Sequence, residues 1–274
     1  MTKNGFMVAN LNPEKVSDLL RQCAREIIMP YHGKLEEHQK QFKNDNARSM
    51  VTVADHEAEK FLSEKLTALI PGSYVVGEES SEDDPGLINH LKDPDKTVWV
   101  IDPVDGTNNY GTGSNTFCVI IALVSGGETK MGWIYDPVND SMAFAEKGKG
   151  AFIDGKKHNV DRNWPVENTH GYSGYRMDAE EKPQNIKMSS LHCSGLEYFR
   201  IVKGERAFSL YHHTKPWDHL AGTLLVQEAG GVCSKWDGSP YRPGDQTGGV
   251  ITAVSKNVWE KVFWPIDRSR TILE

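Results

Sequence analysis

The 274-residue sequence predicts a mixed α/β protein with two interlocked lobes that divide near residue 150. Three observations support this fold class. Helical apolar periodicity dominates the first 70 residues, unbroken apolar runs typical of buried strands follow, and the rest alternates between the two patterns. No internal repeat or long linker separates the halves. A chain of this length, with 38% hydrophobic residues, can bury a large core.

Two helices are expected near the N-terminus. Asn12 is a capping residue followed by proline at the first helical position, and apolar residues then recur at helical spacing as far as Tyr31. Pro30 should kink or end this helix. Residues 34–49 are polar, which is typical of a solvated helix extension or a loop. A second helix is expected from about Asp55 until Pro71-Gly72 ends it.

Short apolar runs then predict strands. Residues 74–76 and 98–101 form two of them, and the acidic, turn-rich residues 81–96 between them are expected to be a surface excursion. The unbroken run 98–101 predicts a strand buried on both faces. Further along the chain, a glycine turn predicts a hairpin. The expected strands are 117–124, 131–135, 142–145, 151–153, 231–235 and 250–254, and the expected helices are 195–203 and 219–229.

Charge and cysteine content exclude several functional classes. With 31 Lys+Arg and 38 Asp+Glu the net charge is −7, so a strongly basic nucleic-acid footprint is absent. No apolar run approaches the roughly 20 residues that span a bilayer, and the first six residues lack the apolar stretch of a secretory signal. A reducing, cytoplasmic compartment is therefore expected. The four cysteines form no C-x-x-C pair and are expected to be buried free thiols; they are Cys23, Cys118, Cys193 and Cys233.

Two aspartates at the end of an apolar strand are the most informative feature. Asp102 and Asp105 are three residues apart, and carboxylates held so close repel and raise one another's pKa unless a cation lies between them. Mg²⁺ prefers such hard oxygen ligands. Gly106 and Thr107 are expected to open a helical turn whose N–H groups point toward a phosphate. A plain surface turn would also suit this composition.

Other acids follow predicted elements. Glu78 and Glu79 come after a short strand, at the edge where open α/β sheets place ligands. Either could instead be a solvated loop charge, and for Glu79 we prefer that interpretation. Asp218 is expected to be the N-cap of a helix, a role compatible with turning an oxygen to a metal.

Four segments resemble, in order, the signatures of the inositol monophosphatase family, the lithium-sensitive, Mg²⁺-dependent phosphatases. They are residues 51–59 around Asp55, Gly77-Glu78-Glu79-Ser80, the run 99–110 with Asp102-Pro103-Val104-Asp105-Gly106-Thr107, and residues 217–231 beginning Trp217-Asp218. The resemblance spans most of the chain. It implies a layered α-β-α-β-α sandwich, a single domain over 1–274 and a homodimer.

The resemblance also implies a metal centre that binds two or three Mg²⁺ ions. Its ligands would be Glu78, Asp102, the carbonyl of Val104, Asp105 and Asp218. It implies that a metal-activated water hydrolyses a small phosphorylated metabolite. Glu78 and Thr107 would orient the water, Asp55 would hydrogen-bond Thr107, and the N–H groups of Gly106 and Thr107 would hold the phosphate.

Substrate residues depart from the family pattern. Inositol-specific members carry a glutamate seven residues before the aspartate of the W-D motif, where this chain has Tyr211. Their glycine-rich stretch corresponds here to about 192–195, which includes Ser194. Tyr211 and Ser194 are therefore candidate substrate residues, with an ordinary strand-end role as the alternative for Tyr211. The first candidate substrate is an inositol-1-phosphate-like ester, and histidinol phosphate is the alternative substrate. A candidate function of a different class is that of a binding protein in transcription antitermination, although the net negative charge argues against an RNA-binding surface.

Overall fold

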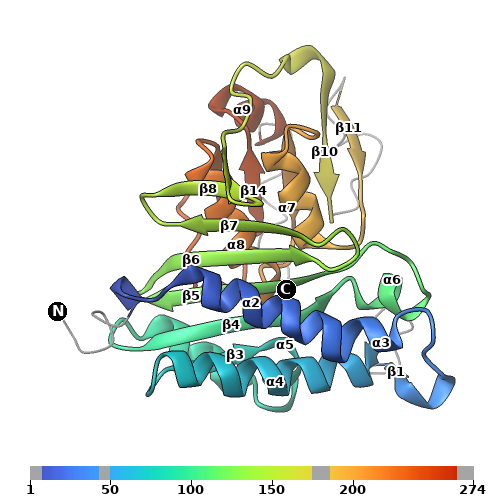
Figure 1. The fold of residues 1–274 in the computed structure, drawn as a ribbon. Helices are drawn as coiled ribbons and strands as arrows, with labels where there is room; N and C mark the ends of the chain where they lie inside the picture. Colours follow the sequence, from blue (N-terminus) through green and yellow to red (C-terminus); the bar gives the residue numbers. More distant parts are fainter. Residues whose placement is uncertain (1–7, 43–49, 175–185, 264–274) are drawn as a thin grey trace.

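Two β-sheets alternate with three layers of helix in the computed structural model, which describes residues 8–42, 50–174 and 186–263 (Figure 1). Helices α2 (Pro13–Cys23) and α4 (Val53–Leu69) cover one face of a seven-stranded sheet. Helices α7 (Ser194–Val202) and α8 (Pro216–Glu228) lie between this sheet and a five-stranded one, and α9 (Lys256–Phe263) packs against strand β14. The expected α-β-α-β-α sandwich is confirmed. Within the described ranges, no helix combines the length and apolar character needed to cross a bilayer.

The seven-stranded sheet has the strand order β3-β4-β5-β6-β7-β8-β9. Only β3 and β4 pair in parallel, and each later strand runs antiparallel to its neighbour. The hairpin expected over residues 117–135 is confirmed as β5 and β6. The strands are β3 (Tyr74–Gly77), β4 (Thr97–Asp105), β5 (Cys118–Ser125), β6 (Glu128–Asp136), β7 (Ser141–Glu146), β8 (Gly150–Ile153) and β9 (Lys156–His158).

Strand β4 is buried along its whole length, as its apolar run predicted. Val98 and Val100 face the core between the two sheets, whereas Trp99 and Ile101 face the core under α2 and α4. Because successive side chains of a strand point to opposite faces, a strand covered on both faces needs apolar residues at every position. The strand that leads to Asp102 is therefore rigidly held.

The five-stranded sheet has the order β11-β10-β12-β14-β13. The strands expected near 231–235 and 250–254 are confirmed as β13 (Val232–Ser234) and β14 (Val250–Ala253). The sheet also contains three strands beyond those expected from the sequence, β10 (Thr169–Ser173), β11 (Ile186–Ser189) and β12 (Phe208–Tyr211). The division of one domain into lobes near residue 150 stays a prediction.

Two segments differ in part from expectation. Residues 81–96 lie largely at the surface, as expected, but they are mostly helical: α5 (Glu78–Asp83) is followed by a 3₁₀-helical segment, Pro85–Lys92, that buries Ile88 and Leu91. These two apolar side chains are three residues apart and share one face of the segment. Of the two alternatives for residues 34–49, a helix extension is wrong for the described part, in which residues 34–36 belong to no helix or strand. A 3₁₀ turn, Glu37–Gln39, leads into β1 (Lys40–Phe42), which pairs with β2 (Met50–Thr52); residues 43–49 lie outside the described ranges.

The first helix ends where Pro30 predicted. After α2, the chain makes a π-helical turn, Ala24–Ile28, and a last turn, α3 (Met29–Tyr31). The N–H of Met29 bonds the carbonyl of Ala24, five residues back. This wider turn changes the hydrogen-bond ladder just before proline, which has no N–H to continue it.

Candidate active site

Parallel pairing of β3 with β4 brings two acidic residues together. Gly77 lies opposite Ile101 in the register of these strands. The next residue of each chain segment is an acid: Glu78 begins α5, and Asp102 continues β4. The sheet therefore delivers both carboxylates to the same edge, which is where α/β sheets bind ligands.

An irregularity in β4 places Asp105 on the same side as Asp102. Asp102 pairs with Ile120 and Asp105 with Cys118, so three steps along β4 match two along β5. In a regular strand, residues three apart point to opposite faces, and one extra residue reverses that relation. Ile120 and Cys118 both face the core between the sheets. The bulge therefore turns both aspartates toward α7 and α8.

Asp218 reaches the cluster from the first turn of α8. It is the third residue of that helix, and Lys215 occupies the cap position, so the expected N-cap role was wrong. Pro216 has a backbone angle suited to the first helical position, and the helix starts there instead. Ligand oxygens of Asp102, Asp105 and Asp218 lie within 4.8 Å of one another.

A cavity of about 190 Å³ contains this cluster. It brings together every residue for which the resemblance implied a metal ligand, together with Gly106 and Thr107. The complete lining is Met50, Glu78, Glu82, Asp102, Val104, Asp105, Gly106, Thr107, Asn108, His192 and Asp218. Residues from both sides of the predicted lobe boundary thus line one cavity.

The carboxylates of the cluster raise one another's pKa. Burial and then the charges of Glu78 and Asp105 raise the pKa of Asp102 well above its ordinary range, and the pKa of Asp218 is raised in the same way. Oδ1 of Asp102 is buried and has no hydrogen-bond partner among the described residues. Such an oxygen, with two more carboxylates beside it, fits a hard divalent cation that would remove the repulsion.

Asp55 and Thr107 form a hydrogen-bonded pair beside the cluster. The Thr107 Oγ1 lies 3.1 Å from Oδ1 of Asp55 and 2.9 Å from the carbonyl of Val104. The other carboxylate oxygen of Asp55 accepts from the N–H and the hydroxyl of Thr52, the residue before α4. Asp55 is fully buried, and this burial raises its pKa to about 7.

Gly106 starts the helical turn that its sequence predicted. It precedes α6 (Thr107–Gly111) and has φ +89°, a backbone conformation that favours glycine. A Cβ atom there would lie 2.9 Å from the carbonyl of Thr116 and 3.2 Å from Cβ of Cys193. Glycine therefore permits both the turn and the close approach of the segment before α7.

Glu59 is a site residue that the sequence analysis missed. Its carboxylate accepts from the N–H groups of Glu79 and Ser80, at 2.8 and 2.9 Å, and so holds the start of α5 that carries Glu78. Glu79 is 6% exposed, so its interpretation as a solvated loop charge was wrong. The available signal was position: Asp55 and Glu59 are four residues apart and share a face of α4.

Ser194 and Tyr211, the candidate substrate residues, make bonds within the protein. The Ser194 hydroxyl lies 3.2 Å from Oδ2 of Asp105 and 2.9 Å from the carbonyl of Asp218. Tyr211 is buried at the end of β12, donates a short hydrogen bond to Glu197 and is absent from the cavity lining. Glu197 also accepts from the N–H of Leu191, at 2.6 Å. A direct contact of either residue with substrate stays a prediction.

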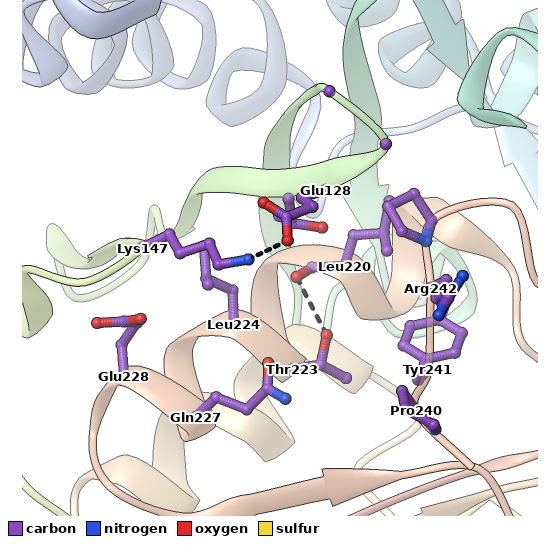
Figure 2. Close-up of a pocket in the computed structure, with 14 residues that line it drawn as sticks. Glu128, Lys147, Leu220, Thr223, Leu224, Gln227, Glu228, Pro240, Tyr241 and Arg242 are labelled. Carbon is purple, nitrogen blue, oxygen red and sulfur yellow. Dashed lines mark hydrogen bonds and ion pairs between the residues drawn. The ribbon is translucent and has the colours of Figure 1, made fainter. Parts of the chain in front are cut away.

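A larger cavity, of about 710 Å³, lies farther along α8 (Figure 2). Three of the charged side chains in its lining are engaged with the protein: Lys147 pairs with Glu128 at 2.6 Å, and Glu228 accepts from the N–H groups of Gly148 and Gly150. None of the clustered aspartates lines it. The smaller cavity therefore remains the candidate active site.

Comparisons with known proteins agree with this site. The sequence profile described as the inositol monophosphatase family matches residues 14–264. The chain is 32% identical to an inositol monophosphatase of Dictyostelium discoideum, over 78% of this chain and 81% of that one. It is 31% identical to a Nus factor SuhB of Xylella fastidiosa, over 68% of each. A solved IMPase of Thermotoga maritima superposes with a TM-score of 0.75 at 25% identity, covering 92% of this chain and 98% of that one.

The layered fold, the carboxylate cluster and these matches define the class of the protein, which is a phosphoric monoester hydrolase. The chain belongs to the inositol monophosphatase family.

Proposed function

We propose that the protein is a Mg²⁺-dependent phosphomonoesterase that hydrolyses a small metabolite phosphate. The observation that supports this best is the gathering of Asp102, Asp105 and Asp218 within 4.8 Å in a cavity that also contains Glu78. When bound there, Mg²⁺ would supply Lewis acidity and lower the pKa of a water molecule. These four carboxylates and the Val104 carbonyl would hold the two or three ions that the family resemblance implies.

Thr107 and Asp55 provide a route for the proton of the attacking water. The hydroxyl of Thr107 has one proton and two acceptors within reach, Oδ1 of Asp55 and the carbonyl of Val104. A water at Thr107 Oγ1 can pass a proton to this hydroxyl while the hydroxyl passes its own to Asp55. A carboxylate whose pKa is about 7 is suited to accept it near neutral pH. Glu78 would orient the water from the end of the neighbouring strand β3.

The phosphate would lie at the start of α6. Gly106 and Thr107 line the same cavity as the carboxylates, so their backbone N–H groups would bind phosphate oxygens while the cations bind others. We propose an inositol-1-phosphate-like ester as substrate, supported by the relative named an inositol monophosphatase. Histidinol phosphate is the alternative, because Tyr211 stands where inositol-specific members have glutamate.

The decisive test replaces Asp105 with asparagine. Asp105→Asn should abolish Mg²⁺-dependent phosphate release, because it removes a charge shared by the whole cluster. Asp136→Asn is the matched control: both carboxylates are 9% exposed, but Asp136 accepts from the N–H of Val138 at a different strand end. We expect this control to keep its activity. Undiminished turnover in Asp105→Asn would refute the site assignment.

A panel of esters would identify the substrate. Phosphate release should be measured on inositol, histidinol, sugar and nucleotide phosphates, with and without Mg²⁺. Inhibition by lithium is expected from the family resemblance, and insensitivity at millimolar concentrations would contradict it. A homodimer and a cytoplasmic location stay predictions; a monomer in light scattering would overturn the former.

A binding role is the second candidate function. The observation that favours it is the 31% identity to a Nus factor. A protein of this kind would bind a partner of the transcription machinery and need no turnover. Absence of phosphate release across the ester panel, together with binding to RNA polymerase, would favour this candidate over the phosphatase.

A further inference from the structure

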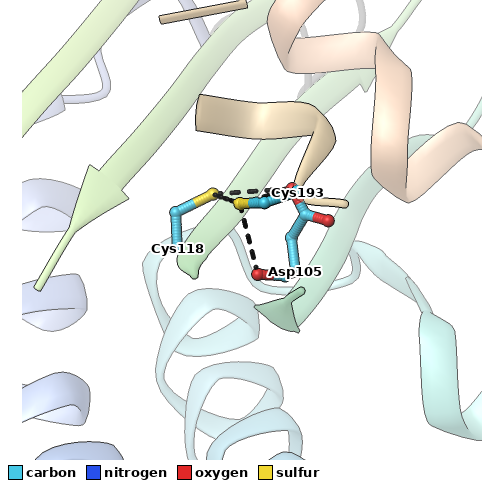
Figure 3. A group of neighbouring side chains, drawn as sticks. All are labelled: Asp105, Cys118 and Cys193. Carbon is cyan, nitrogen blue, oxygen red and sulfur yellow. Dashed lines mark hydrogen bonds between the residues drawn. The ribbon is translucent and has the colours of Figure 1, made fainter. Parts of the chain in front are cut away.

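Two thiols meet one carboxylate oxygen behind the candidate active site (Figure 3). Cys118, at the start of β5, and Cys193, just before α7, have their sulfur atoms 3.6 Å apart. Their distances to Oδ2 of Asp105 are 3.6 Å and 3.4 Å. Both cysteines are buried, at 0% and 2% exposure. Three elements distant in sequence therefore bring two sulfurs and an oxygen into one small triangle.

The size of this triangle matches one face of a tetrahedral zinc site. With Zn–S of about 2.3 Å, Zn–O of about 2.1 Å and tetrahedral angles, the S···S edge is about 3.8 Å and each S···O edge about 3.6 Å. The observed edges, 3.6, 3.6 and 3.4 Å, agree to within a few tenths of an ångström. The Ser194 hydroxyl lies 3.2 Å from the same Oδ2 and is the nearest further oxygen for a fourth position.

A disulfide explains this arrangement less well. The S–S bond length is about 2.05 Å, so the sulfurs would have to approach by about 1.5 Å. A soft cation needs no such approach, since it fits at the present spacing.

We propose that Cys118, Cys193 and Asp105 form a binding site for a thiophilic divalent cation such as Zn²⁺, and that this cation opposes binding of Mg²⁺ through their shared aspartate. On binding, two S–H bonds break, two metal–sulfur bonds form, and both protons pass to solvent; nothing is oxidised or reduced. The inhibitory effect rests on the proposed function, whereas cation binding does not.

The soft cation and Mg²⁺ would oppose each other's binding because both use the carboxylate of Asp105. Oδ2 of Asp105 accepts from the N–H of Gly195 at 2.6 Å and from the Ser194 hydroxyl as well as from both thiols. A cation on this oxygen takes up charge that otherwise attracts Mg²⁺ to the cluster, and the two dications repel each other. By linkage, Mg²⁺ must weaken binding of the soft cation to the same extent.

Titration of the reduced full-length protein with Co²⁺, without Mg²⁺, tests the site directly. Thiolate ligands give Co²⁺ a charge-transfer absorption that carboxylates do not give. We expect this band to saturate at one ion per chain, to disappear when Zn²⁺ is added, and to need at least tenfold more Co²⁺ in Cys118→Ser and in Cys193→Ser. Cys23→Ser and Cys233→Ser, thiols elsewhere in the chain, are matched controls and should leave it unchanged.

Three results would overturn the site: no thiolate band in the wild type, an undiminished band in both site variants, or a band lost in the controls. Should the site variants fail to fold, zinc X-ray absorption of the wild type decides the question. Two sulfur neighbours at about 2.3 Å are expected, and a shell of oxygen alone would refute the proposal.

An assay of phosphate release tests whether Zn²⁺ opposes the binding of Mg²⁺. Zn²⁺ should inhibit the wild type, and raising Mg²⁺ tenfold should raise the Zn²⁺ needed for half-inhibition by up to about tenfold, the limit for mutual exclusion. Cys193→Ser should need at least tenfold more Zn²⁺. No effect of Mg²⁺ would overturn the opposition. If no ester is hydrolysed even without Zn²⁺, the proposed phosphatase fails while the cobalt band still decides the site.

Discussion

The charge of Asp102 connects the candidate metal site to folding stability, and this connection can be tested. Asp102→Asn keeps the size of a side chain that is 1% exposed and removes one charge from the carboxylate cluster. Without a cation, the cluster opposes folding, because the carboxylates are spread apart in the unfolded chain. The variant should therefore be more stable than the wild type when divalent cations are absent, although it is expected to be inactive.

The distances in the cluster set the size of this effect. At a separation of 4.8 Å, the upper limit for these oxygens, and an effective dielectric constant of about 20, two carboxylates repel by about 3.5 kcal/mol. Proton uptake by the wild type relieves part of this repulsion near neutral pH. We therefore expect a gain of about 2 kcal/mol in the free energy of unfolding, or about 4 °C in Tm for a chain of this size.

Thermal unfolding in a chelator and in excess Mg²⁺ measures the effect. At pH 8, Mg²⁺ should raise Tm of the wild type and should raise that of Asp102→Asn much less. The pH dependence has a definite sign: the pKa of Asp102 is raised above its ordinary value of 3.8 in the folded protein. The wild type without cations should therefore lose stability as pH rises above about 4, and the variant should lose less.

Two outcomes would refute this reasoning. One is a variant less stable than the wild type in chelator, which would show that Asp102 stabilises the fold by bonds and not by holding a cation. The other is an equal gain from Mg²⁺ in both proteins. Asp136→Asn, a buried carboxylate away from the cluster, should keep the full gain from Mg²⁺.

Three further predictions follow from neighbouring groups. Because the pKa of Asp55 is raised to about 7, its contribution to stability is present below pH 4 and lost as pH rises to 7, so Asp55→Asn should flatten stability measured over this range. Gly77→Ala would place a Cβ 2.2 Å from Cδ of Glu59; we expect a loss of at least about 2 kcal/mol in urea unfolding, and a smaller loss would contradict the close approach. Tyr211→Phe removes the donor to Oε2 of buried Glu197, while Oε1 keeps the N–H of Leu191, and should cost about 1–3 kcal/mol; a neutral effect would show that the bond is unimportant.

Much of the fold was predictable because local patterns and tertiary packing agree. The apolar run of β4 required burial on both faces, and the structure provides two cores for it. Predictions failed where polar segments pack through a few apolar residues. In the 3₁₀-helical segment Pro85–Lys92, Ile88 and Leu91 are buried and Leu87 packs against the core, a pattern too short for periodicity to detect.

The sequence alone indicated Glu78, Asp102 and Asp105 as candidate acids, because their positions after apolar strands are local properties of the chain. It also indicated Gly106, whose positive φ a glycine permits. Only the tertiary structure showed that Glu59 holds the start of α5, that Tyr211 bonds Glu197 and that Cys118 meets Cys193 at Asp105. The physical reason is that these contacts join residues 13 to 88 positions apart. Strand register and helix packing decide such contacts, and no local pattern encodes them.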